Sequence, residues 1–294
     1  MTPLTLTARG HHQHRGPIPT AARDTEPAIL CLHCSTGSSR QWRALAARLG
    51  GKRAIIAPDL LGYGANPSWP RERRSSLGLE VARVLEQLPA DLGPVDVVAH
   101  SFGAAVAVKL ALGHAHRVRS LTLYEPVLFG LLSQDLDAVA LAEIFTLGAR
   151  MEQALASRNL DAAARHFIDF WSGAGSFDTM APARRQGVCA SIDKVRADFG
   201  ALLDDETTTE TLARLDMPVL CMYGERSPGV TRRIAQLLAR IVPGITTKRI
   251  DGAGHMGPLT HADEVNACIE AFVCFLSTQQ AKVNPSSAFS ARAA

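Results

Sequence analysis

The sequence has little net charge and no apolar stretch long enough to cross a membrane. Its formal net charge is only +3 over 294 residues, and its single basic cluster is a short one at Arg71, Arg73 and Arg74. A nucleic-acid site needs a concentrated basic surface, so we interpret this cluster as a solvated surface segment. The N-terminus also lacks the apolar core of a signal peptide. These absences predict a cytoplasmic protein without a nucleic-acid partner or a membrane span, and they leave the oligomeric state open.

Metal-binding and disulfide patterns are equally sparse. His11, His12 and His14 lie in a weakly patterned N-terminal segment, which does not preorganise ligands around a metal. Cys31 and Cys34 have C-x-x-C spacing but straddle a strand end and a polar turn, whereas a redox motif opens a helix. We therefore predict no metal and no cofactor, and buried free thiols in a reducing compartment.

Short apolar runs bounded by Gly, Pro or Asp alternate with longer amphipathic stretches. We predict strands at residues 28–33, 53–57, 95–99, 120–124, 218–223 and 246–250. Because these runs are almost continuously apolar, they are typical of parallel strands covered on both faces. We predict helices at residues 39–49, 77–88, 102–113, 230–241 and 261–276. The alternation predicts an α/β fold with a mostly parallel central sheet and helices on both faces.

One long stretch breaks this alternation. Residues 127–212 contain no convincing strand and are too numerous for a loop, so we predict an inserted helical cap there. The core is then expected over residues 28–126 and 213–277. Residues 1–27 are predicted to be an N-terminal arm with at most weak edge strands, and residues 278–294 a disordered tail.

A serine stands at the apex of a predicted strand–turn–helix. The run VDVVA leads into His100-Ser101-Phe102-Gly103 and then into an Ala-rich helix. This matches the nucleophile elbow G-x-S-x-G, except that Ala99 replaces the first Gly. Such a turn lifts the hydroxyl above the sheet edge and aims the next backbone N–H, that of Phe102, at the same point. A serine in this setting can also simply cap a helix, but the strand before it favours a nucleophile.

A histidine follows the last predicted strand on a Gly-rich loop, Asp251-Gly252-Ala253-Gly254-His255. Because the carboxyl ends of parallel strands meet at one edge of the sheet, His255 can lie beside Ser101. An imidazole accepts a proton near neutral pH, so we predict that His255 is the base that activates Ser101.

The carboxylate that should orient this base is absent from its usual place. After the strand PVLCMYG, the position expected to hold the acid is Ser227. Three carboxylates can replace it: Glu125 at the end of the strand SLTLY, Glu225 near the empty position, and Asp251 in the loop of His255. We predict Glu125, because it ends the strand that follows the nucleophile helix, and the other two remain alternatives.

These segments together resemble the α/β-hydrolase superfamily in its cap-domain, carboxylesterase-like branch. The resemblance covers about residues 28–277 and rests on HCSTGSSRQW, PDLLGYGANP, AHSFG, GERSP and GAGHMGP. It implies a nucleophile at Ser101, a base at His255 and an oxyanion hole formed by the N–H groups of Ser35 and Phe102. Cys34 replaces the family's glycine, and its side chain is expected to narrow the oxyanion loop. Haloalkane dehalogenases, a related subset, carry their acid at the position of Glu125.

The predicted reaction is acyl transfer from a hydrophobic carboxylic ester to Ser101 and then to water, without a cofactor. A serine nucleophile argues against dehalogenase and epoxide hydrolase chemistry, since both use an aspartate. Hydrolysis of a C–C bond in a diketone, of a thioester or of an amide remains possible on the same site. A degenerate homologue that only binds a ligand is a further alternative. Apolar side chains of the cap are expected to bound the substrate: Phe129, Leu131, Leu132, Phe145, Phe167, Phe170 and Trp171.

Overall fold

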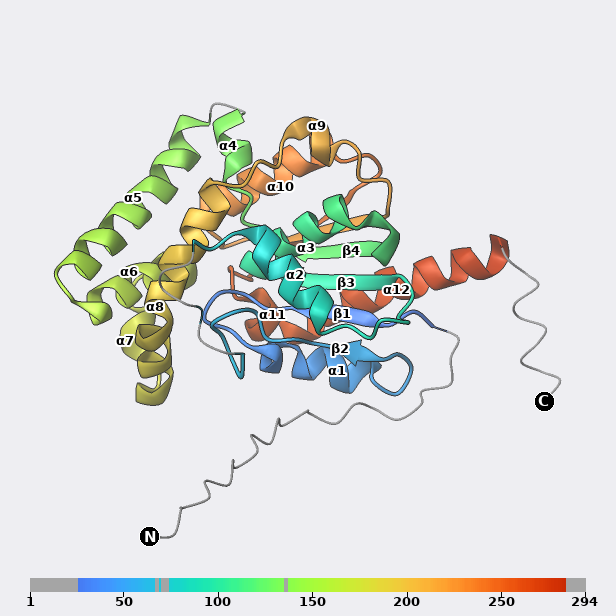
Figure 1. Ribbon diagram of the computed structural model, residues 1–294, viewed down its shortest axis with the longest axis horizontal. Helices are drawn as coiled ribbons and strands as arrows, with labels where there is room; N and C mark the ends of the chain where they lie inside the picture. Colours follow the sequence, from blue (N-terminus) through green and yellow to red (C-terminus); the bar gives the residue numbers. More distant parts are fainter. Residues whose placement is uncertain (1–25, 67–68, 70–73, 135–136, 284–294) are drawn as a thin grey trace, which may run out of the picture.

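The computed structural model describes residues 26–66, 69, 74–134 and 137–283. Several predictions fall outside these residues: nearly all of the predicted arm, the histidines at 11, 12 and 14, and the clustered arginines at 71 and 73. Of the tail that was predicted to be disordered, residues 278–283 are described and continue the last helix. Six parallel strands form one sheet in the order β2-β1-β3-β4-β5-β6, so the predicted α/β fold is confirmed (Figure 1). The strands are β1 (Ile29–Leu32), β2 (Ile55–Ile56), β3 (Val95–His100), β4 (Val118–Tyr124), β5 (Val219–Gly224) and β6 (Thr246–Ile250).

The inner strands are buried on both faces, as their continuous apolar sequences predict. Every residue of β1 and of β3 is buried, including Asp96 and His100. The last strand is different, and the prediction of two covered faces is wrong for it. In β6 the first four residues are exposed and only Ile250 is buried, because β6 is the edge strand and pairs only with β5. Its sequence TTKRI, with two threonines and two cations, fits this edge position.

Helices cover the two faces of the sheet as two layers. On one face, Trp42, Leu45 and Val265 belong to a hydrophobic cluster with Ile29 and Val98 of the strands. Elements on this face are η1 (Ser39–Trp42), α1 (Arg43–Leu49) and α12 (Ala262–Val283). A larger cluster on the other face contains α2 (Leu77–Glu86), α3 (Phe102–Gly113) and α10 (Gly229–Ile241). The helix α3 is apolar on every side except at Lys109, because it is buried between the sheet and α2.

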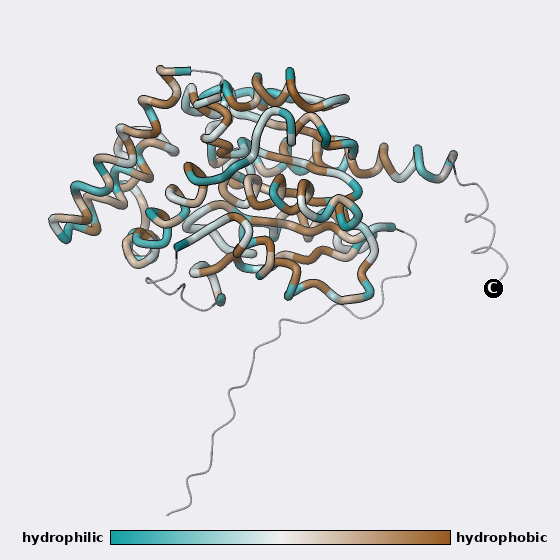
Figure 2. The backbone as a smooth tube through the Cα atoms, turned by 45° about the horizontal axis from the view of Figure 1, so that its top comes forward, coloured by the Kyte–Doolittle hydropathy of each residue, from teal (hydrophilic) through white to brown (hydrophobic). Residues whose placement is uncertain are grey.

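The described part of the chain between β4 and β5 consists of helices and their connections, without a strand. It forms α4 (Gly130–Gln134), α5 (Ala138–Ala156), α6 (Leu160–Ser172), α7 (Ser176–Thr179), α8 (Pro182–Leu203) and α9 (Thr209–Leu212). We call these the inserted helices. Figure 1 shows α5, α6, α7 and α8 beyond one end of the strands. Along α5, hydrophobic and hydrophilic residues alternate, as expected of a helix with one buried face (Figure 2).

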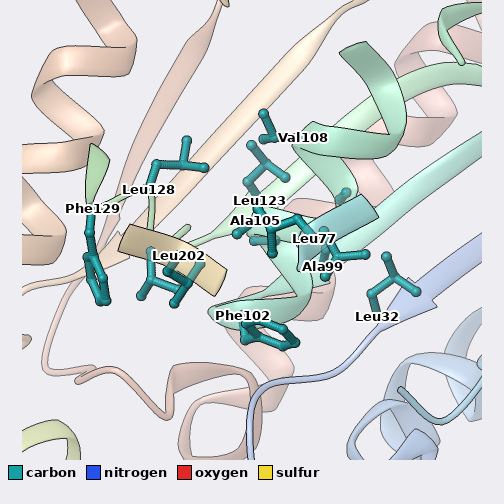
Figure 3. Close-up of a cluster of buried hydrophobic side chains, with 14 of the residues drawn as sticks. Leu32, Leu77, Ala99, Phe102, Ala105, Val108, Leu123, Leu128, Phe129 and Leu202 are labelled. Carbon is teal, nitrogen blue, oxygen red and sulfur yellow. The ribbon is translucent and has the colours of Figure 1, made fainter. Parts of the chain in front are cut away.

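The inserted helices share the core of the sheet. Phe129 and Leu202 of the insertion lie in the same hydrophobic cluster as Phe102 of α3 and Leu32 of β1. Figure 3 shows these side chains gathered around the start of α3. The start of α3, which directly follows β3, is therefore packed between the sheet and the inserted helices.

The cysteines are less uniformly buried than the sequence predicts. Cys31, Cys34 and Cys221 are buried, but Cys189 and Cys268 are only half-buried, and the side chain of Cys274 is exposed. All six are free thiols. Cys274 is exposed because it lies on the outward face of α12, next to Val273, which packs against the sheet. Within the described residues, no helix combines the length and hydrophobicity that a membrane span requires.

Candidate active site

The serine elbow is a sharp turn with a strained backbone. Ser101 follows the last residue of β3 and has φ 55° and ψ −119°, a conformation that residues with a side chain rarely adopt. Its N–H donates to the carbonyl oxygen of Tyr124 at 3.0 Å, which anchors the turn to β4. Position 103, two residues after Ser101, has room only for glycine. A Cβ there would lie 2.4 Å from the carbonyl oxygen of His33 and 2.6 Å from that of Leu32.

The structure brings Ser101, His255 and Glu125 into one chain of hydrogen bonds. Nε2 of His255 lies 2.9 Å from Oγ of Ser101, and Nδ1 lies 2.6 Å from Oε2 of Glu125. A carboxylate only accepts, so Nδ1 carries a proton and Nε2 is free to accept one from Ser101. All three side chains are buried: Ser101 is 7%, His255 3% and Glu125 0% exposed. Exclusion of water strengthens each of these electrostatic interactions.

Glu125 reaches His255 because the usual acid position holds a small residue. Oε1 of Glu125 accepts a short hydrogen bond from Oγ of Ser227 and one from the N–H of Gly224 at 2.7 Å. Ser227 therefore occupies the expected acid position but serves as a donor to the carboxylate that replaces it. Gly224 is needed beside it, since a Cβ there would lie 2.5 Å from the carbonyl oxygen of Ala253. Glu125 itself has φ 47°, a second strained residue at the same sheet edge.

The two alternative carboxylates have other partners. Glu225 accepts a hydrogen bond from the N–H of Gly252 at 2.9 Å, and Asp251 pairs with Arg249 at the same distance. The side chains of Glu225 and Asp251 are 44% and 74% exposed, respectively. Glu125 is the carboxylate that the structure places against His255.

A second hydrogen-bonded chain, which the sequence analysis missed, ties the backbone of His255 to the oxyanion loop. Nε2 of His100 donates to the carbonyl oxygen of His255 at 2.8 Å. Nδ1 of His100 lies 3.1 Å from Nε2 of Gln41, whose Oε1 accepts from the N–H of Cys34 at 3.2 Å. Burial and the neighbouring His255 hold the pKa of His100 well below its usual value, so this imidazole is neutral. The sequence signal was the histidine directly before the elbow serine.

The predicted oxyanion residues lie on two sides of Ser101. The N–H of Phe102 is the first of α3, so it has no acceptor within its own helix. Ser35 and Thr36 follow β1 and line the same cavity as Ser101. Cys34 packs inward and is 4% exposed, and burial raises the pKa of its thiol to about 11, which keeps it protonated.

Beside the loop, His33 is buried as a neutral side chain. Its Nδ1 donates to the carbonyl oxygen of Cys34 at 2.8 Å, and its Nε2 accepts from the N–H of Leu60 at 3.0 Å. Burial lowers the pKa of His33 to about 4, and Asp59 nearby opposes the shift only in part. His33 therefore fixes the start of the loop without bringing a charge to it.

A cavity of about 190 Å³ lies over Ser101 and His255. Of the apolar side chains predicted to bound it, Phe167 and Trp171 of α6 do so. The indole of Trp171 lies over the imidazole of His255, with ring centroids 4.3 Å apart. The other candidates do not line it: Phe145 lines a separate hollow between α5 and α8, and the rest belong to the large hydrophobic cluster or pack against it. Arg184 of α8 also lines the cavity, a cation that the sequence analysis did not single out.

Comparison with known proteins assigns the family. A profile described as the alpha/beta hydrolase family matches residues 29–268. The chain belongs to this family. Among curated relatives, the chain is 37% identical over 116 residues to Lipase LipV of Mycobacterium tuberculosis, which is 40% of this chain and 41% of the relative. It is 35% identical over 83 residues to 2-hydroxymuconate semialdehyde hydrolase of Pseudomonas sp., which is 28% of this chain and 29% of the relative. The chain thus matches less than half the length of each of these relatives.

Among solved structures, the chain resembles the carboxylesterase CesB of Bacillus subtilis. The TM-score is 0.63 at 20% sequence identity, over 86% of this chain and 85% of the carboxylesterase. At this identity the likeness concerns the fold. In the described residues of the chain, no group of three or more His, Cys, Asp or Glu side chains is arranged to hold a metal ion.

Proposed function

We propose that this protein is a serine hydrolase that cleaves a small or medium hydrophobic carboxylic ester through an acyl-enzyme on Ser101. One observation carries the proposal: the unbroken, buried hydrogen-bond chain from Ser101 through His255 to Glu125. An imidazole in this arrangement accepts the serine proton while the carboxylate stabilises the resulting imidazolium. The strained elbow adds an unpartnered helix N–H beside the serine, where negative charge develops on a carbonyl oxygen.

The first half of the reaction forms the acyl-enzyme. Oγ of Ser101 attacks the ester carbonyl carbon as Nε2 of His255 takes the hydroxyl proton. The carbonyl oxygen becomes an oxyanion, held by the backbone N–H groups of Phe102 and Ser35. As the tetrahedral intermediate collapses, the C–O bond to the alcohol breaks and His255 returns the proton to the departing oxygen.

The second half releases the acid. Water takes the place of the alcohol, His255 removes one of its protons, and the hydroxide attacks the acyl carbon. The same two N–H groups hold the second oxyanion. Collapse then breaks the bond to Ser101, which recovers its proton from His255. Acid and alcohol leave, and the enzyme returns to its starting state.

The cavity supports an ester with a short acyl chain. Its volume of about 190 Å³ is below the range of about 300–1,000 Å³ that is common for sites of drug-sized ligands. Phe167, Ile168 and Met180 give it apolar walls, which favours a hydrophobic acyl group.

A fluorophosphonate tests this proposal directly, because it phosphonylates a serine only where a base activates it. We expect one adduct per chain, on the peptide that contains Ser101, and none in Ser101→Ala. We also expect turnover of nitrophenyl esters, with hydroxylamine intercepting the acyl-enzyme. Absence of both the adduct and the turnover from the folded wild-type protein rules out the serine-hydrolase proposal.

A second candidate is hydrolysis of a C–C bond in a vinylogous diketone that carries a carboxylate. Arg184 favours it, since a guanidinium in an otherwise mainly apolar cavity matches a carboxylate well. The name of one relative, 2-hydroxymuconate semialdehyde hydrolase, gives a muconate-derived semialdehyde as the substrate of that protein. Side-by-side kcat/KM values for nitrophenyl butyrate and for a muconate-type ring-cleavage product separate the candidates. The C–C candidate requires that the ring-cleavage product be the better substrate and that Arg184→Met raise its KM.

A further inference from the structure

A cluster of buried charges joins helix α8 to the core beside the candidate active site. Lys194 and Asp198 lie one turn apart on α8, and Glu80 lies on α2. Nζ of Lys194 donates to Glu80 at 2.9 Å and forms a shorter bond with Asp198. All three side chains are at most 6% exposed. Burial of three charges costs free energy even when they are paired, so simple attachment of α8 does not explain the cluster.

Asp198 connects this cluster to the oxyanion loop. Its Oδ2 accepts a hydrogen bond from Oγ of Ser35 at 3.0 Å and another from the hydroxyl of Tyr63 at 2.5 Å. Its Oδ1 accepts from Lys194. Both carboxylate oxygens thus accept hydrogen bonds, and Ser35 is the residue whose backbone N–H the proposed mechanism uses. A side chain held in this way fixes the orientation of its own peptide group.

Helix α8 also holds the next residue of the loop. Nη1 of Arg184 donates to the carbonyl oxygen of Thr36 at 2.8 Å, and Nη2 lies 3.4 Å from its Oγ1. Thr36 has φ 58°, a left-handed conformation that is unfavourable for a β-branched residue. A conformation of this kind persists only when its surroundings enforce it. Two bonds from α8 therefore enforce a strained loop at the point where the oxyanion is expected.

The same helix reaches the other expected donor. Nζ of Lys194 lies 5.0 Å from the centre of the Phe102 ring, within the range of a cation–π contact. The residues on both sides of the oxyanion position, Ser35 and Phe102, are thus in contact with one segment of α8.

We propose that helix α8 positions the oxyanion loop, with Asp198 acting as a positioning residue through the hydroxyl of Ser35. This inference rests on the proposed serine-hydrolase function and extends it to the inserted helices. The oxyanion hole is complete only when α8 is docked on the core. The insertion thus has two roles: α6 bounds the substrate cavity, and α8 holds the loop that stabilises the transition state.

Ser35→Ala is the main test, because it removes the hydroxyl but retains the backbone N–H. Loss of one oxyanion donor costs about 100- to 1,000-fold in kcat, and a misplaced donor costs less, so we expect about a tenfold fall in kcat. We expect KM for a nitrophenyl ester to stay within about twofold, since the ground state uses the hole little. A trifluoromethyl ketone, which forms an oxyanion on the serine, should bind about tenfold more weakly, and the corresponding alcohol equally well.

Asp198→Ala and Glu80→Gln complete the test. Asp198→Ala should lower kcat as Ser35→Ala does, and the double variant should fall little further, because both remove the same contact. Glu80 hydrogen-bonds to Lys194 and to the N–H of Leu61 rather than to Asp198 or the loop, so Glu80→Gln should cost stability but leave kcat within about twofold.

Wild-type kcat in Ser35→Ala overturns the positioning role, as does an equal loss of kcat in Glu80→Gln. If Asp198→Ala fails to fold, Ser35→Ala still tests the positioning role on its own. Failure of the function itself is recognised separately, because the wild-type protein then forms no fluorophosphonate adduct.

Discussion

The acid–base side of the candidate site and its oxyanion side are held by different parts of the molecule. Ser101, Glu125 and His255 follow β3, β4 and β6, so one hydrogen-bonded sheet sets their spacing. The oxyanion loop follows β1 but is held from the opposite direction by α8 of the insertion. The acid–base residues are held by hydrogen bonds within the sheet, whereas the oxyanion loop depends on the packing of α8 against the core. Changes to the two sides should therefore have different kinetic signatures.

Glu125→Gln should give the largest effect on the acid–base side. An amide cannot stabilise the imidazolium and can leave His255 in the wrong tautomer, so kcat should fall by about 1,000- to 10,000-fold with the fold intact. Steady-state kinetics with a nitrophenyl ester, with thermal unfolding as a check, measures this. Glu225→Gln and Asp251→Asn are matched controls at the alternative carboxylates and should stay within about twofold. A mild effect of Glu125→Gln favours a ligand-binding homologue over an efficient hydrolase.

Gly103→Ala should affect both sides at once, because this glycine touches the end of β1. A Cβ would lie 2.4 Å from the carbonyl oxygen of His33, so the elbow and the oxyanion loop must separate. We expect about a 100-fold loss of kcat and about 1–3 kcal/mol of destabilisation. Gly113→Ala at the other end of α3 is the control, since a Cβ there meets no atom within 4 Å. Similar losses in the two variants contradict the proposed role of close packing at the elbow.

Acid should weaken the packing of the oxyanion side through His33. Its pKa is about 4 in the folded protein and about 6.5 when unfolded, so the unfolded state binds the proton more readily between these values. Stability is fully present above pH 6.5 and decreases as the pH falls towards 4. At pH 5 the expected loss is about 2 kcal/mol.

Urea unfolding at pH 7 and pH 5, in the wild type and in His33→Asn, isolates this contribution. The variant should lose less stability over this interval than the wild type. The comparison is necessary because burial raises the pKa of Glu80 and of Asp198, which makes acid favour the folded state at those groups. Equal pH dependence in the two proteins contradicts a buried neutral His33.

Trp171→Ala should have the smallest effect, on selectivity rather than on rate. The indole bounds the cavity over His255, so its removal leaves room for longer acyl groups. We expect the preferred nitrophenyl ester to lengthen by two or more carbons, with about a fivefold change in relative kcat/KM. Phe145→Ala is the control, because Phe145 is 54% exposed and lies in a separate hollow. An unchanged chain-length profile in Trp171→Ala excludes this residue as a boundary of the acyl site.

Much of the fold could be predicted because the chain carries local signals. The apolar runs around Leu30 and Val97 have the length and continuity of covered parallel strands, and the observed strands coincide with them. The edge strand β6 was the exception, because the two threonines and two cations of TTKRI are tolerated where a neighbouring strand is missing, and only the sheet order reveals that position. The side chains that bound the cavity were equally hard to predict. Whether an apolar residue on a helix packs into the core or faces a cavity depends on how the helix is placed in the tertiary structure.

The sequence by itself determined the α/β alternation, the serine at a strand–helix turn and the histidine on a terminal Gly-rich loop, because each depends on neighbours along the chain. Tertiary structure decided which carboxylate meets His255, since Glu125 and Ser227 are 102 positions apart yet hydrogen-bonded. It also decided that Asp198 of α8 reaches Ser35, across 163 positions. Such pairings depend on how layers stack, and no local pattern of residues records the distance between two layers.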